Sequence, residues 1–233
     1  MTKPKSNNFG SNCSILSAIA FIIGGISFFN LPEIQMSGIR SGNSDQLSSY
    51  FNSVALEPTF LQIQMWSFVF VGILGLAIVI SAYKYLKDLE EDIIAWSSIL
   101  GLIGYGVMCT NFSRIVDQLP KRAKFFVEGD EQFQTAMLGA NSINLDPSGL
   151  IAFGFVGFWL IIINYFARDK ENYPNLLAYI GMVSGVLFFF VAIGNIVDER
   201  ILVKIAAGLG SLFLGPIWLI WFGLTLRKID RSD

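Results

Sequence analysis

Long apolar runs alternate with polar segments along the chain. Six of these runs approach or reach the roughly 20 residues that a helix needs to cross a bilayer core of about 30 Å. They cover residues 14–31, 61–83, 93–113, 150–167, 174–197 and 201–226. Lys204 is the one charged residue within these bounds. Because lipid offers the backbone no hydrogen-bond partners, we expect an all-α membrane protein whose six transmembrane helices form an antiparallel bundle.

The first run raises the question of a signal peptide, because Lys3 and Lys5 precede it. No small-x-small cleavage site follows the run, which continues into Asn30-Leu31-Pro32-Glu33. We therefore expect a retained helix. The predicted organisation is a single membrane domain over residues 14–228, with cytoplasmic tails at 1–13 and 229–233.

Lysine and arginine are unevenly distributed, and cytoplasmic segments of membrane proteins are enriched in them. With the N-terminus inside, the short inner segments hold nine: Lys3, Lys5, Lys84, Lys87, Arg168, Lys170, Arg227, Lys228 and Arg231. The longer outer loops hold six: Arg40, Arg114, Lys121, Arg122, Lys124 and Arg200. Aromatic residues expected at the inner interface are Tyr83, Tyr85, Trp96, Tyr165, Tyr173, Trp218 and Trp221. Both termini are therefore predicted to be cytoplasmic.

Two outer loops are long enough to form short amphipathic helices. In the first, Asn43 is the predicted start, Pro58 the end, and Leu47, Tyr50, Phe51 and Val54 share one face. In the second, Asp130 is the predicted cap, and Phe133, Ala136, Met137 and Ala140 repeat the spacing. These helices either cover the bundle or lie in the headgroup layer; the alternative is a lid or a docking surface.

Most polar residues within or beside the spans lie toward their outer ends. The candidate outer polar cluster comprises Gln62, Gln64, Asn111, Arg114, Asp117, Asn195, Asp198, Glu199, Arg200 and Lys204. Arg114 and Asp117 are three residues apart and are expected to pair, and Asp198 or Glu199 is expected to neutralise Lys204. One hypothesis is a functional vestibule. The other is that these are interfacial residues at helix ends, with Lys204 extending toward water.

Three further features concern packing. Gly215-Pro216 in the last run predicts a kink, since proline removes a backbone donor, and this pair is a candidate hinge. Gly181 and Gly185 form a G-x-x-x-G motif, which serves either oligomerisation or contacts within one chain. Asn164 is expected to be an amide in a helix contact rather than a ligand.

The composition excludes several kinds of chemistry. The chain has no histidine, which rules out a Ser–His–Asp triad and histidine-ligated haem. Only 15% of its residues are charged, and a net charge of −2 gives no indication of nucleic-acid binding. No Asp or Glu lies at the midplane of a predicted span, which makes proton-coupled transport a weaker hypothesis.

Two segments resemble a family of uncharacterised bacterial six-helix membrane proteins, known only as a domain of unknown function. They are ALEPTFLQIQMW, which leads into the second span, and GPIWLIWFGLTLRK, which closes the sixth. The resemblance covers about residues 14–228. It implies six spans and a plasma-membrane location, and it supplies no catalytic residues.

These observations favour a non-enzymatic membrane protein that acts as a scaffold or as a subunit of a membrane complex. A channel or carrier for a small solute, entered from the outer polar cluster, is the alternative. An intramembrane lipid-modifying enzyme that uses Asp117, Asp198 or Glu199 is a second alternative. We expect no cofactor. The expected partners are the lipid bilayer and either a second copy of the chain or another membrane protein.

Overall fold

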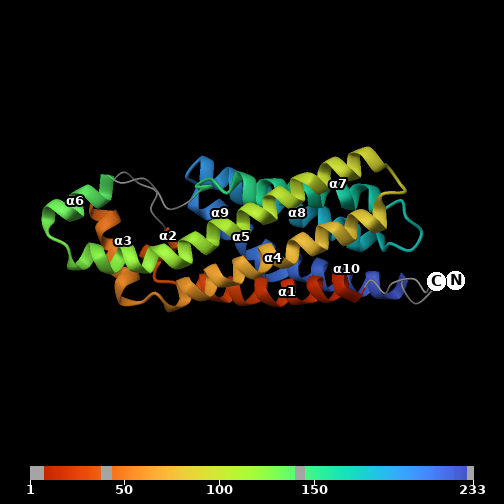
Figure 1. Ribbon diagram of the computed structural model, residues 1–233. Helices are drawn as coiled ribbons and strands as arrows, with labels where there is room; N and C mark the ends of the chain where they lie inside the picture. The colour runs from red at the N-terminus through yellow and green to blue at the C-terminus, as the bar shows by residue number, and fades with distance from the viewer. Residues whose placement is uncertain (1–7, 38–43, 140–144, 230–233) are drawn as a thin grey trace.

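The structure is a computed structural model that describes residues 8–37, 44–139 and 145–229 (Figure 1). Its helices are α1 (Asn8–Phe29), α2 (Glu33–Ser37), α3 (Ser44–Leu56), α4 (Thr59–Leu86), α5 (Glu91–Glu128), α6 (Glu131–Gly139), α7 (Val156–Ala167), α8 (Asn175–Ile196), α9 (Arg200–Gly208) and α10 (Gly215–Ile229). Two π-helical turns, η1 (Leu150–Phe155) and η2 (Leu209–Leu214), precede α7 and α10. The described residues contain no strand, so the all-α prediction is confirmed.

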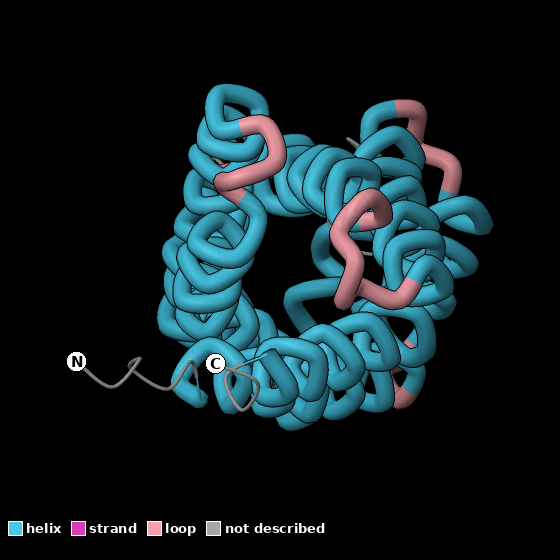
Figure 2. Tube along the Cα trace, turned by 90° about the vertical axis from the view of Figure 1, so that its right-hand side faces the viewer, coloured by secondary structure: helices cyan, strands magenta, loops and turns pink. Residues whose placement is uncertain are grey.

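Six helical spans of the described chain are long and apolar enough to cross a membrane, as predicted. They are α1, α4, α5, η1 with α7, α8, and α9 with η2 and α10. Each span packs against the next, and α10 packs against α1, so the spans form a closed ring. Figure 2 is viewed along the axis of this ring. Buried side chains of the hydrophobic core fill its centre.

The two ends of the bundle differ. We use the name base for the end at which α1 begins and α10 ends. At the base, Arg227 of α10 donates a hydrogen bond to Asn12 of α1. The opposite end carries a lobe made of α2, α3, α6 and residues 115–128 of α5 (Figure 1). Helix α5 has 38 residues. Such a helix is about 57 Å long and therefore extends well beyond a bilayer core of about 30 Å.

The prediction that the third span ends near Ser113 was wrong, because α5 continues through Pro120 to Glu128. Leu119, Ala123 and Phe126 recur at helical spacing in this extension and are buried in the lobe. Their partners in α3 include Phe51, whose ring stacks on Phe126 with 5.0 Å between centroids. Burial of this apolar stripe explains why the helix persists past the membrane.

The two outer amphipathic helices are present as α3 and α6. The face predicted for α3 is confirmed: Tyr50, Phe51 and Val54 are buried, and α3 ends before Pro58. Its predicted start, Asn43, lies outside the described residues. Asp130 caps α6, since its Oδ1 accepts a hydrogen bond from the Phe133 backbone N–H at 2.8 Å.

The apolar face predicted for α6 is mostly wrong. Met137 packs against the lobe core, whereas Phe133 and Ala136 are exposed. The fourth residue of that face, Ala140, lies outside the described residues. Helix α6 is therefore held mainly through its cap and its contacts with α3 and α5.

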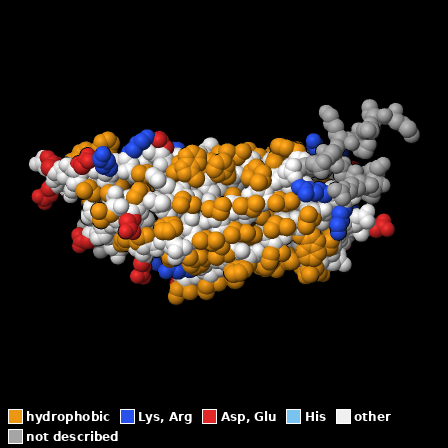
Figure 3. Space-filling model, turned by 90° about the horizontal axis from the view of Figure 1, so that it is seen from below, with side chains coloured by type: hydrophobic (Ala, Val, Ile, Leu, Met, Phe, Trp, Pro, Cys, Tyr) orange, Lys and Arg blue, Asp and Glu red, His pale blue; other side chains and the backbone are white. Residues whose placement is uncertain are grey.

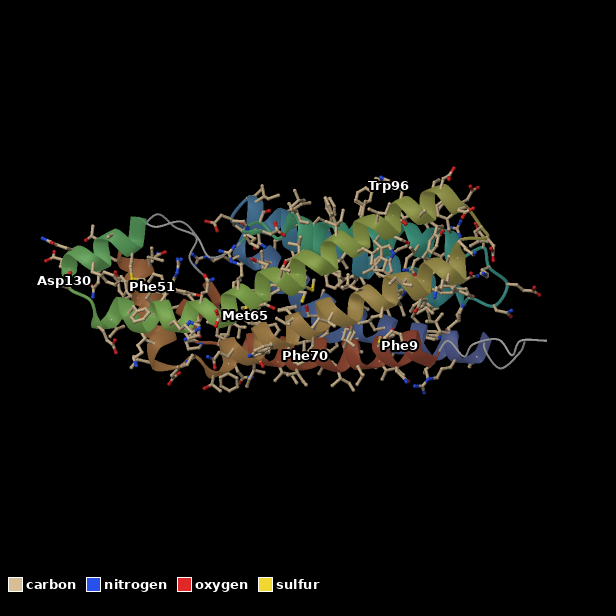
Figure 4. All side chains as sticks on the ribbon, in the orientation of Figure 1. Phe9, Phe51, Met65, Phe70, Trp96 and Asp130 are labelled. Carbon is tan, nitrogen blue, oxygen red and sulfur yellow. The ribbon has the colours of Figure 1, made fainter. Side chains whose placement is uncertain are left out.

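On the face seen in Figure 3, apolar side chains cover the middle of the molecule and charged side chains gather toward its two ends. Phe70 and Trp96 point away from the bundle on its outer surface, and both are about half exposed (Figure 4). Tyr85, Tyr173 and Trp218, which we expected near the inner interface, are buried between the helices instead of lying on this surface. They complete the aromatic filling of the base-side half.

The G-x-x-x-G residues make contacts within the chain. A Cβ built on Gly185 would lie 2.5 Å from the carbonyl oxygen of Gly157, so α7 and α8 touch backbone to backbone there. A Cβ on Gly181 would collide with the side chain of Asn164. This motif therefore packs α8 against α7 in the monomer.

Asn164 is fully buried on the base side and connects three parts of the chain. Its Nδ2 donates to the Leu160 carbonyl oxygen at 2.8 Å. Its Oδ1 accepts hydrogen bonds from the Tyr173 hydroxyl at 2.6 Å and from the Trp218 Nε1–H at 2.9 Å. The prediction that this amide serves a helix contact is thus consistent with its surroundings.

Candidate functional site

A cavity of about 150 Å³ lies inside the lobe-side half of the bundle, and we call it the lobe-side cavity. Helices α1, α4, α5, α8 and α9 and both π turns contribute to its wall. Its lining residues are Gly24, Gly25, Phe28, Phe29, Gln64, Phe68, Phe112, Phe153, Val191, Asn195, Val203, Ala207 and Ser211. None of these described residues carries a charge.

A layer of phenylalanine rings closes the cavity toward the base. This phenylalanine floor consists of Phe21, Phe68, Phe112, Phe153 and Phe188. Phe68 stacks on Phe112 with 4.8 Å between ring centroids, and Phe153 packs edge-on against Phe68 at 5.9 Å. Below the floor, Tyr105, Trp159 and Trp218 continue the aromatic core. The cavity is therefore separated from the base by packed side chains.

Both π turns border the cavity, η1 through Phe153 and η2 through Ser211. In η2 the Gly215 N–H bonds the Gly210 carbonyl, five residues back, and Pro216 follows directly. Pro216 has no N–H to donate, so the series of helical backbone hydrogen bonds is interrupted there, and the wider π turn accommodates this interruption. The predicted kink at Gly215-Pro216 thus coincides with a π turn in the cavity wall, while its role as a hinge stays a prediction.

Asp146 positions the start of η1. Its Oδ2 accepts hydrogen bonds from the backbone N–H groups of Ile151 and Ala152, at 3.0 and 2.8 Å. Gly149 lies between Asp146 and Ile151 in sequence and has φ 69°, a conformation that favours glycine. A Cβ on Gly149 would lie 2.9 Å from the Phe153 side chain. Asp146 was not among the predicted site residues, although Asp-Pro-Ser-Gly before an apolar run is typical of a helix start.

Two of the predicted polar residues hold the segment that leads into η1. The Asn111 Oδ1 accepts a hydrogen bond from the Leu145 backbone N–H at 2.8 Å. The Asn195 Nδ2 donates to the Ser148 carbonyl oxygen at 3.0 Å. Asn195 also lines the cavity, so α5 and α8 together fix this part of its wall.

The residues of the candidate outer polar cluster differ in burial. Gln64, Asn111 and Asn195 face the interior, whereas Arg114, Asp117, Asp198, Glu199 and Arg200 are exposed and Gln62 and Lys204 are half-buried. This division follows the position of each residue on its helix. Three amides occupy core-facing positions, and the ionisable groups lie on outward faces or in turns.

Both predicted ion pairs were wrong. Asp117 pairs with Lys121, one turn further along α5, at 2.5 Å rather than with Arg114. Within the described residues Lys204 forms no ion pair with Asp198 or Glu199. Glu199 instead accepts a hydrogen bond from the Ile201 N–H at 3.2 Å and caps α9, and Asp198 occupies the turn with φ 55°. Capping and turn geometry direct these carboxylates away from Lys204.

Gln64 is the unusual group in the cavity wall. Its side chain is 92% buried, and its Oε1 has no hydrogen-bond partner among the described residues. A buried amide without a partner costs free energy, because its hydration is lost without replacement. The uncharged wall, which also includes Asn195 and Ser211, therefore contains one buried polar group without a described partner.

The next feature concerns metal-ligating side chains and thiols. No group of three or more Cys, Asp or Glu side chains in the described chain is close enough to hold a metal ion. Cys13 and Cys109 are both free thiols. What the arrangement can do is accommodate a small, uncharged and mainly apolar molecule.

The fold and the cavity together define a class, an all-helical multi-pass membrane protein whose six described spans close around an aromatic core. Residues 14–223 match the family described as domain of unknown function DUF4386, and the chain belongs to that family. The resemblance inferred from the two hydrophobic segments is thereby confirmed. No curated protein and no solved structure matches the chain significantly.

Proposed function

We propose that this chain is a non-enzymatic protein of the plasma membrane that serves as a scaffold or as a subunit of a membrane complex. The observation that carries the proposal is the filled core. In the middle of the described ring, the phenylalanine floor and Tyr105, Trp159 and Trp218 pack against one another. Asp146, at the lobe end, is the one buried charged side chain in the described part of the protein.

The proposed orientation places the base in the cytoplasm. Short connections at the base carry Lys87, Arg168 and Lys170, and the ends of α4 and α10 add Lys84, Arg227 and Lys228. Positive residues in short segments beside the spans are typical of cytoplasmic loops. The lobe then faces the outside of the cell.

The lobe is the proposed docking region. Its own apolar core, which includes Phe51, Val54 and Phe126, makes it a fixed platform rather than a loose loop. Leu56, Phe125 and Phe133 are 82%, 59% and 46% exposed on it. Large exposed apolar side chains on a rigid element are typical of protein contacts.

Cysteine labelling tests both the closed core and the orientation. In a Cys13→Ser, Cys109→Ser background, single cysteines replace Thr135 in the lobe, Glu171 at the base and Ser184, which is buried in α8 below the floor. A membrane-impermeant thiol reagent applied to intact cells should label Thr135→Cys alone. Opened cells should add Glu171→Cys, and Ser184→Cys should stay unlabelled from either side.

Crosslinking tests the scaffold role directly. A photoreactive residue at Phe125 or Phe133 should give the same discrete adduct, and one at the lipid-facing Ile99 should give none. An adduct of twice the chain's mass identifies the partner as a second copy. If neither lobe position forms a protein adduct in cells, the scaffold proposal is wrong.

The lobe-side cavity favours a carrier as the second candidate function. A carrier would require the phenylalanine floor to open, and Ser184→Cys would then become reactive from at least one side. The lipid-modifying enzyme has less support, because Asp117 and Glu199 are engaged in an ion pair and a helix cap at the surface.

A further inference from the structure

We propose that the lobe-side cavity binds a neutral, phenol-sized aromatic molecule through a hydroxyl group that pairs with Gln64. This goes beyond the scaffold role and does not depend on it. The argument rests on the cavity's volume, its uncharged lining and the unpartnered amide.

The size of the cavity limits the ligand. A volume of about 150 Å³ is comparable with engineered apolar cavities that bind benzene. One six-membered ring with a small substituent therefore fits, whereas a sugar, a nucleotide or a whole lipid does not. A ligand of this size lies between the rings of the floor and the walls of α1 and α9.

The lining determines the ligand's polarity. Phe68, Phe112 and Phe153 present ring faces and edges, which suit an aromatic partner in offset or edge-on packing. Because the described lining contains no charged side chain, a charged ligand would lose its hydration without compensation. The ligand is therefore neutral and mainly apolar.

Gln64 selects the hydrogen-bonding group. Its amide offers an acceptor at Oε1 and donors at Nε2, and Oε1 is buried without a partner. A hydroxyl can donate to the first or accept from the second, so it matches the amide in either orientation. Such a bond would relieve the cost of the buried unpaired acceptor.

Access is easiest between α1 and α9. Phe29 is exposed there, and Val203 and Ala207 are half-buried, so the cavity wall borders the molecular surface at this point. Both sides of this seam lie within spans that are long and apolar enough to cross a membrane. Either a free aromatic alcohol dissolved in the bilayer or the ring of a phenolic lipid could enter by this route.

The test uses the full chain in lipid nanodiscs and two small probes, 4-fluorophenol and fluorobenzene. Fluorine NMR measures binding of each probe against empty nanodiscs, which corrects for partition into lipid. We expect the wild type to bind 4-fluorophenol at least tenfold more tightly than fluorobenzene. Equal binding of both probes, or binding of neither, would overturn the proposal.

Three variants locate the site. Gln64→Met keeps the length of the side chain but removes the amide, and it should reduce the preference for the phenol to less than twofold. Ala207→Phe fills the cavity and should weaken both probes at least tenfold. Gln62→Leu, two residues away on α4 and outside the lining, should change neither. A loss of preference in Gln62→Leu equal to that in Gln64→Met would contradict the assignment.

The same assay distinguishes the two sources of ligand. Long-chain 4-pentadecylphenol in the nanodisc lipid should displace 4-fluorophenol if the cavity takes the ring of a phenolic lipid. Retained 4-fluorophenol binding at that lipid fraction would assign the site to a free aromatic alcohol. Both results support the shared hydroxyl-aromatic chemistry, which the wild-type, Gln64→Met and Gln62→Leu results can reject.

Discussion

Two buried amides occupy opposite halves of the same bundle and have opposite surroundings. Asn164, on the base side, uses both ends of its amide in hydrogen bonds to Leu160, Tyr173 and Trp218. Gln64, on the lobe side, has a buried Oε1 without a described partner and lies against a cavity. The difference separates an amide that fixes helix positions from one whose buried oxygen has no described partner.

The backbone shows the same contrast. On the base side, α7 and α8 pack closely enough that Gly157 and Gly185 touch through their backbones. On the lobe side, two spans contain π turns, and both turns border the cavity. Since π turns are wider than α-helical turns and are frequent at functional sites, their position supports the binding site proposed for the lobe-side half.

The largest expected effect comes from Asn164→Leu. The substitution removes the acceptor of the Tyr173 hydroxyl and the Trp218 Nε1–H, and it leaves both donors buried. Each unpaired buried donor costs ~1–3 kcal/mol, so the free energy of unfolding should fall by about 3 kcal/mol. Reversible unfolding by sodium dodecyl sulfate measures this change.

Asn195→Leu is the control for that experiment, because Asn195 is half-buried, whereas Asn164 is fully buried, and its Nδ2 donates to the Ser148 carbonyl oxygen in the lobe-side wall. Its effect should be clearly smaller. An equal loss of unfolding free energy in the two variants would contradict the comparison. It would mean that the base side does not depend especially on the fully hydrogen-bonded amide of Asn164.

The next effect concerns the close helix contact. In Gly185→Ala the added methyl would lie 2.5 Å from the Gly157 carbonyl oxygen and 2.8 Å from the Ile161 side chain. Because one contact is backbone, the helices must separate, and overpacking of this kind costs ~1–3 kcal/mol. Gly106→Ala is the matched control, since its Cβ meets no atom within 4 Å. Unfolding of that variant should show no loss of stability.

Gln64→Met should change stability least among the buried amides. It exchanges an unpaired polar group for an apolar one of similar length, so unfolding free energy should stay within about 1 kcal/mol of the wild type or rise. The same denaturation assay applies, with Gln62→Leu beside it. A loss as large as that of Asn164→Leu would mean that Gln64 has a structural partner.

Much of the fold follows from hydrophobic periodicity. Six spans, the short base connections and the buried face of α3 are all readable from it, because lipid and core both require continuous apolar stretches. The extension of α5 was not predicted, since Pro120 and several charges interrupt the apolar run. Only the contact with Phe51 in α3 reveals what Leu119 and Phe126 bury against.

The site was less predictable. Polar residue types near the outer helix ends could be read from the sequence, and Gln64 was among them. Which of those residues face inward depends on the rotation of each helix within the ring. Local contacts also decide which groups pair. Asp117 pairs with Lys121 one turn along α5, and Glu199 caps α9. These contacts replace the predicted ion pairs.

The smallest expected effect concerns two buried tyrosines at opposite ends. Burial raises the pKa of the Tyr50 phenol in the lobe and of the Tyr173 phenol at the base above the ordinary value of 10. An unfolded tyrosine ionises near that pH, whereas the buried phenol does not. The stabilising contribution is therefore fully present below pH 10 and is lost as the pH rises above it. Tyr50→Phe and Tyr173→Phe should each reduce the alkaline loss of stability, measured by unfolding between pH 9 and pH 11.

At neutral pH only Tyr173→Phe should be destabilised, by about 1 kcal/mol, because it alone gives up a hydrogen bond to Asn164. Equal neutral-pH stability of the two variants would show that the Asn164 network contributes less than its geometry indicates.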